Sequence, residues 1–136
     1  MLFRTVIVIL SFLTIASSAH ALHFHVNPET GDDRRSVQSA QDPSTPFKTV
    51  EHALRIAHLV TEGRPHVIEL PAGTYSPSTG VKFPLTISQP GIYIKTNGLT
   101  VFDAEGKSNF FNITGKTSNF TIQGIDFYNG VAEKGG

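Results

Sequence analysis

The strand His66-Val67-Ile68-Glu69-Leu70, closed by the turn Pro71-Ala72-Gly73, sets the pattern for the rest of the chain. Apolar residues of similar short strands return at a constant interval of 26 residues, in the pairs Ile68 and Ile94, Ile87 and Ile113, and Val101 and Phe127. The step from Ile94 to Ile122 is 28 residues, which one looser turn absorbs. A recurrence of this length, with several short strands in each repeat, is typical of stacked parallel coils.

Short strands and turns account for the chain after residue 65. The expected strands are 66–70, 85–87, 92–94, 100–102, 111–113, 120–122 and 125–127, separated by turns rich in Gly and Asn, among them 97–98 and 124. In a coil stack, successive strands lie about 4.8 Å apart and inward side chains form columns. An antiparallel sandwich has similar alternation but does not explain the recurrence. The prediction is therefore an all-β right-handed parallel β-helix, a solenoid of about three coils.

One amphipathic helix is expected before the coils. Apolar residues recur with helical spacing at positions 50, 53, 54, 57 and 60. Thr49 is a suitable N-cap, and Gly63 and Pro65 end the helix, so that it covers residues 49–61. A strand at 22–26 and a turn-rich loop precede it. Since the first coil has no predecessor, we expect the helix to cap its apolar end.

The first 21 residues have the layout of a secretory signal peptide. Arg4 is followed by a mostly apolar run at 6–15 and by Ala19-His20-Ala21, a small-residue cleavage site. The exported chain is expected to begin at Leu22 and to be secreted, extracellular or at the cell surface. The predicted segments are the signal at 1–21, the N-terminal strand, loop and capping helix at 22–65, and the first coils at 66–136.

Composition argues against several function classes. The chain has 11 basic and 11 acidic residues and no basic run, so it has no electrostatic basis for binding nucleic acid. No second long apolar stretch follows the signal, and no membrane contact is expected after cleavage. Cysteine is absent, so the exported chain must be held by its apolar core and by stacking instead of disulfides.

Four stretches share a family pattern. They are Phe-His-Val-Asn-Pro with Thr-Gly-Asp-Asp at 24–33, Pro-Ser-Thr-Pro-Phe-Lys-Thr-Val at 43–50, Ile-Glu-Leu-Pro-Ala-Gly-Thr-Tyr at 68–75, and the coil-like sequence at 119–130. Together they resemble the N-terminal region of pectate-lyase-like right-handed parallel β-helix proteins, which include secreted β-helix proteins of unknown function. The resemblance is specific for the fold and leaves activity open, because such folds serve lyases, hydrolases, epimerases and adhesins.

The resemblance also bears on cofactors and partners. In the lyases of this family, an aspartate-rich calcium site and a basic proton abstractor lie on later coils. No catalytic residue and no cofactor is therefore expected in this segment, and Ca²⁺ only in a longer parent protein. The chain ends at 133–136 in mid-coil, which predicts truncation. Polysaccharide is the implied partner, and the open coil end is expected to self-associate.

Two groups of residues are candidate metal ligands. His23 and His25 lie two apart on a strand and share a face, which is half of a metal site, with His66 as a conceivable third ligand. Cleavage after Ala19 would expose the amine and imidazole of His20, a chelating pair for copper. Solvent-facing strand residues are the ordinary alternative for the histidine pair.

The aspartates of the N-terminal loop are the second group. Asp32, Asp33 and Asp42 offer oxygen ligands for Ca²⁺, but their spacing fits no compact loop such as an EF-hand. Asp32 more simply bonds local backbone amides in a turn.

Other polar residues fit sugar chemistry or modification. Asp103, Glu105 and Asp126 follow or end strands and would suit acid–base cleavage of a glycan, although solvated carboxylates are the usual outcome. Tyr75, Tyr93 and Tyr128 can stack on sugars or pack in the core. Asn112 and Asn119 begin N-glycosylation sequons, and stacking of Asn and Thr between coils is the alternative.

Two functions remain open for the parent protein. The first is a secreted lyase-type enzyme that acts on or binds a polyuronate, as the resemblance implies. The second is a non-enzymatic β-helix used for adhesion or as a scaffold, which is consistent with the lack of recognisable catalytic residues in this segment.

Overall fold

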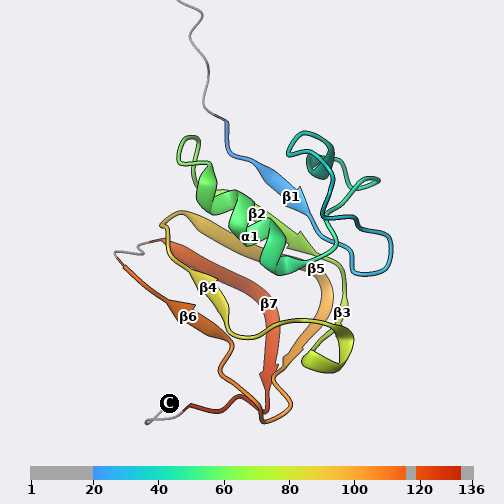
Figure 1. Cartoon of the computed structure of the whole chain (residues 1–136), viewed down its shortest axis with the longest axis vertical. Coiled ribbons are helices and arrows are strands. Elements are labelled where there is room, and N and C mark those ends of the chain that lie inside the picture. The colour runs from blue at the N-terminus through green and yellow to red at the C-terminus, as the bar shows by residue number, and fades with distance from the viewer. Residues whose placement is uncertain (1–19, 116–118, 133–136) are drawn as a thin grey trace, which may run out of the picture.

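The computed structural model describes residues 20–115 and 119–132 (Figure 1). Its elements are β1 (His23–His25), α1 (Val50–Leu59), β2 (His66–Leu70), β3 (Gly73–Tyr75), β4 (Leu85–Ile87), β5 (Ile92–Asp103), β6 (Phe111–Ile113), β7 (Phe120–Tyr128), and two short 3₁₀ helices at Ser39–Gln41 and Pro77–Thr79. The chain is thus mostly strand with one α-helix in these ranges, in agreement with the predicted all-β class.

Two sequence predictions fall on other residues. The signal peptide at 1–21 lies outside the described residues except for its last two positions, and the chain end at 133–136 lies outside them too. Neither helical type in the described ranges has the length and hydropathy of a membrane span.

All of the paired strands run parallel. β2 and β3 lie along one edge of β5, β7 lies along the other edge, and β1 pairs with β2. β4 and β6 form a separate two-stranded sheet. Figure 1 shows β1, β2, β5 and β7 following one another across the molecule, with α1 beside the β1–β2 end. Because all neighbours are parallel, every connection between them is a crossover.

The sequence recurrence corresponds to cross-strand pairing. Ile68 of β2 lies opposite Ile94 of β5, and Ile94 lies opposite Ile122 of β7. In the smaller sheet, Ile87 lies opposite Ile113. Residues 26 or 28 positions apart in the chain are therefore direct neighbours, as the repeat predicts.

The prediction for the second half of β5 is wrong by one residue. Val101 lies opposite Asp126, and Phe102 lies opposite Phe127. The predicted strand breaks at 97–98 and 124 are wrong as well, since β5 and β7 each continue through them. The physical reason is a register shift between Lys95 and Thr100, an irregularity of the β-bulge kind that changes the pairing without ending the strand.

Inward side chains form columns across the strands. Phe24, Ile68 and Ile94 are each fully buried and lie opposite one another on β1, β2 and β5, with the partly exposed Ile122 next in line. Burying such a side chain is worth roughly 1.5–3 kcal/mol. Phe127, on β7, is 43% exposed, so burial declines from β1 toward β7.

Helix α1 is the predicted capping helix, shortened at both ends. Thr49 is its N-cap, and the Thr49 hydroxyl accepts a hydrogen bond from the His52 amide at 3.2 Å. The helix contacts both β2 and β4 through its apolar side, where Leu54 is 2% exposed. It ends before Gly63 because Val60 is already extended, with its carbonyl bonded to the buried His66 ring at 2.9 Å.

Asp33 anchors the start of α1. Its carboxylate accepts hydrogen bonds from the Lys48 amide at 2.8 Å, the Thr49 amide at 3.0 Å and the Thr49 hydroxyl at 2.6 Å. The same loop requires Gly31, since a Cβ there would lie 2.1 Å from the Phe47 carbonyl oxygen. The residues that match the family pattern at 24–33 thus position the capping helix.

Candidate functional site

The face of the larger sheet that points away from the core carries two rows of side chains. Strand alternation places them opposite the buried column that contains Ile68 and Ile94. Successive strands contribute His25, Glu69, Lys95 and Gln123 to one row, and His23, Val67, Tyr93 and Thr121 to the other. We call these eight residues the outward strip.

Glu69 is the electrostatic centre of the outward strip. Its Oε2 accepts hydrogen bonds from His23 Nε2 at 2.8 Å and from Lys95 Nζ at 2.9 Å. These bonds, first the one from Lys95, lower the pKa of Glu69, so the carboxylate is ionised at neutral pH. The Glu69 side chain is 18% exposed and that of Lys95 is 35% exposed, which leaves the ammonium accessible to a second anion.

The two histidines of β1 lie against each other. The rings of His23 and His25 are stacked, with centroids 4.6 Å apart and planes at 18°. Partial burial and the neighbouring His23 ring lower the pKa of His25. The strand pairing places Glu69 opposite His25, and ligand atoms of all three residues lie within 4.8 Å of one another.

The predicted metal-ligand pair therefore has a third member that the sequence analysis missed. His66 is the wrong third residue: it is fully buried, and its ring bonds the Leu22 amide at 3.0 Å and the Val60 carbonyl. Glu69 lies on the face opposite to that of buried Ile68. Its alternation with Ile68, combined with the parallel pairing of strands 22–26 and 66–70, was the signal that could have identified it.

The three loop aspartates serve local structure. Asp32 pairs with Arg34, which lowers the pKa of Asp32, and accepts the Arg34 amide at 2.9 Å as an Asx-type turn does. Asp42 accepts bonds from the amide and hydroxyl of Ser44. With Asp33 at the helix start, they do not converge on one point within the described ranges.

The strand-end carboxylates are held in turns. Asp103 Oδ1 accepts bonds from the Glu105 amide at 2.8 Å and from the Asn129 side chain at 2.9 Å. Glu105 accepts the Ser78 amide at 2.9 Å and pairs with Lys107. These contacts join successive layers of the stack, and they leave two of the three proposed acid–base residues bound to protein donors.

The Glu105 contacts predict a pH-dependent contribution to stability. The bond from Lys107, followed by those from Ser78, lowers the pKa of Glu105 from 4.5 to about 2. Because the folded pKa is lower, the carboxylate stabilises the fold above pH 4.5 and loses this effect as the pH falls through about 2. Denaturant unfolding should show Glu105→Gln to be less stable than wild type at neutral pH and nearly equal at about pH 2. A stability difference that persists unchanged in acid would contradict this role.

The tyrosines divide between core and surface. Tyr75 is 3% exposed and its hydroxyl bonds the Pro71 carbonyl at 3.1 Å, so it is a packing residue. Tyr93 lies in the outward strip and donates to the Gln123 side chain. Tyr128, near the end of β7, is 55% exposed.

The sequon asparagines are both exposed. Asn112 lies in β6, opposite Thr86 of β4, and Asn119 directly precedes β7 with a φ of 61°. Their exposure is compatible with modification, and the position of Asn112 beside Thr86 is the one expected for stacking between coils.

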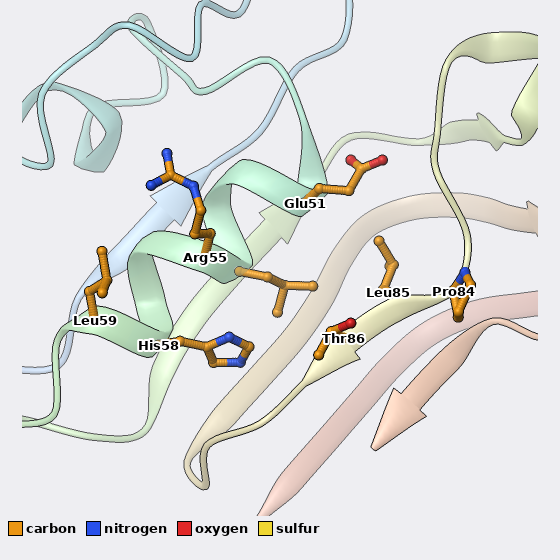
Figure 2. A pocket seen from close by; sticks show the side chains of 8 residues that line it. Glu51, Arg55, His58, Leu59, Pro84, Leu85 and Thr86 are labelled. Carbon is orange, nitrogen blue, oxygen red and sulfur yellow. The ribbon is translucent and has the colours of Figure 1, made fainter. Parts of the chain in front are cut away.

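A separate pocket of about 380 Å³ lies between α1 and β4 (Figure 2). Figure 2 shows His58 on the helix and Thr86 on the strand facing the same gap. His58 Nε2 is buried without a hydrogen-bond partner among the described residues, and burial lowers the pKa of His58. A helix covers the edge of β4 where a strand would pair with it, and the imperfect fit between the two leaves this space.

Comparison with known proteins assigns the chain to a family but to no activity. No curated protein and no solved structure is significantly similar to it. A family model described as "Protein of unknown function (DUF1565)" matches residues 30–134, which include the anchoring loop, α1 and β2 to β7. The matched range covers most of the chain, and the chain therefore belongs to the DUF1565 family.

Proposed function

We propose that this chain forms the first coils of a right-handed parallel β-helix in an exported protein that binds or acts on polysaccharide. The 26- and 28-residue spacing of parallel partners and the helix at one end support the β-helix. The signal-like sequence at 1–21 supports export to the extracellular space or the cell surface. The resemblance to pectate-lyase-like proteins is the argument for a polyuronate.

The outward strip is the observation that carries the binding proposal. Tyr93 offers an aromatic face, Lys95 an accessible ammonium and Gln123 an amide, on neighbouring strands about 4.8 Å apart. Aromatic rings pack on the apolar faces of sugars, and an ammonium pairs with carboxylates such as those of uronic acids. A linear acidic glycan lying across the strands would meet these groups in succession.

The test is calorimetric titration of the chain with polygalacturonate oligosaccharides. We expect Tyr93→Ala and Lys95→Gln each to weaken binding by about fivefold or more, since each removes a contact worth about 1 kcal/mol. Arg55→Gln, which removes an exposed cation from α1 instead, should bind like wild type. Unchanged affinity in both strip variants would exclude the strip as the binding surface.

The same material distinguishes the enzymatic from the non-enzymatic alternative. In this segment we expect binding without release of unsaturated products, with or without Ca²⁺, because no family catalytic residue maps onto it. Protein-dependent formation of unsaturated uronides would place an active site within these coils. Failure to bind any polyuronate would favour an adhesion or scaffold role, and self-association through the β6 and β7 edges, where Ile113 and Phe127 are exposed, belongs to that role.

A further inference from the structure

The outward strip contains a group of side chains that the proposed function does not use. His23 and His25 on β1 and Glu69 on β2 present two imidazoles and one carboxylate, with ligand atoms within 4.8 Å of one another. Within residues 20–115 and 119–132 this is the one cluster of three such groups. We propose that His23, His25 and Glu69 bind a transition-metal ion, Zn²⁺ in the first instance.

The backbone already provides most of the required geometry. The two imidazoles share a face because they lie two residues apart, and the pairing of β1 with β2 places Glu69 directly opposite His25. Tetrahedral zinc with bonds of about 2.0–2.1 Å requires ligand atoms about 3.3 Å apart. His23 Nε2 and Glu69 Oε2 are 2.8 Å apart in the metal-free protein, so small side-chain rotations complete the site.

The ligand set selects the class of metal. Imidazole nitrogens suit Zn²⁺ and similar late transition metals, whereas Ca²⁺ requires six or more oxygen ligands. Three protein ligands leave a fourth position open for water. The side chain of His23 is 40% exposed, and a pocket lined by His25 and Glu69 lies beside the cluster, so both an ion and its water can enter from solvent.

Lys95 is the intramolecular competitor for this site. Its ammonium bonds the same Glu69 oxygen that bonds His23, at 2.9 Å, and it balances the carboxylate charge in the metal-free protein. A bound divalent cation would take over the carboxylate and repel the ammonium toward solvent. Metal binding is thus an exchange of one cation for another on Glu69, and it requires no change in the backbone.

The test is titration of the untagged 136-residue chain, freed of metal with a chelator, with Zn²⁺ alone. Calorimetry should show saturable one-to-one binding in wild type, with affinity reduced by about tenfold or more in His23→Gln, His25→Gln and Glu69→Gln. His52→Gln, which removes an α1 imidazole packed on Phe47, should leave the affinity unchanged. Circular dichroism of the metal-free variants checks that each is folded.

Two further readouts make the proposal specific. Lys95→Gln removes the competitor and should tighten Zn²⁺ binding several-fold, and unchanged or weaker binding would overturn the exchange on Glu69. Co²⁺ in place of Zn²⁺ should give the visible absorption of a low-symmetry four-coordinate site in wild type and not in His25→Gln. Absence of saturable binding, or binding that survives loss of both β1 histidines, would overturn the site. Neither result depends on polysaccharide, so the glycan proposal is tested separately.

Discussion

Replacing Leu54 by Asp is expected to lower the free energy of unfolding by about 3 kcal/mol or more. Leu54 is 2% exposed on the side of α1 that meets β2 and β4, among residues of the apolar core. The substitution places a carboxylate there with no charged partner, in addition to removing the buried leucine. Chemical denaturation followed by circular dichroism measures the change.

The neighbouring position supplies the control. Arg55 is exposed on α1, and Arg55→Asp introduces the same side chain in the same helix turn. It should cost less than about 1 kcal/mol, since a surface charge remains solvated. Similar losses in the two variants would mean that α1 does not cap the apolar end of the stack.

Replacing Asp33 by Ala is expected to cost about 2 to 3 kcal/mol, because hydrogen bonds to a charged group are stronger than neutral ones and two backbone amides lose their acceptor. The carboxylate connects the loop to Lys48 and Thr49 at the start of α1. Asp33→Asn retains one acceptor oxygen without the charge and should fall between wild type and Asp33→Ala. Thermal or denaturant unfolding of the three proteins tests this order.

Asp32→Ala is the matched control for this loop. Asp32 bonds Arg34, whose side chain is 90% exposed, so solvent replaces most of the lost interaction. Its effect on stability should be much smaller than that of Asp33→Ala. Equal effects would indicate that the loop matters only as a whole and that the Asp33 bonds to the helix start have no special weight.

The strand positions and the capping helix were predictable from local patterns. Alternation identified β1, β2, β4 and β6, and the 26-residue recurrence identified Ile94 as the partner of Ile68 before any pairing was observed. Thr49 was predictable as an N-cap because its hydroxyl acts on an amide three residues away. Each of these features depends on residues close in sequence or on a repeat that the sequence displays directly.

The register of β5 and β7 was decided by the tertiary structure. The irregularity between Lys95 and Thr100 shifts the partner of Val101 from Phe127 to Asp126. Both registers keep an apolar residue in the inward column, by way of either Val101 or Phe102, so alternation alone does not distinguish them. The aromatic packing of Phe102 on Tyr75 and Phe127, with centroids 5.5 and 5.8 Å apart, accompanies the observed register.

The candidate sites also divide along this line. The sequence by itself determined that His23 and His25 share a face, because a strand has a period of two. Only the tertiary structure brought Glu69 to them, because a carboxylate 46 positions from His23 in the chain becomes its neighbour through the β1–β2 register. The same reason explains Asp33, whose partners Lys48 and Thr49 lie 15 and 16 positions away across a loop. Short-range periodicity is written in the order of residues, whereas contacts between distant segments depend on how the whole chain packs.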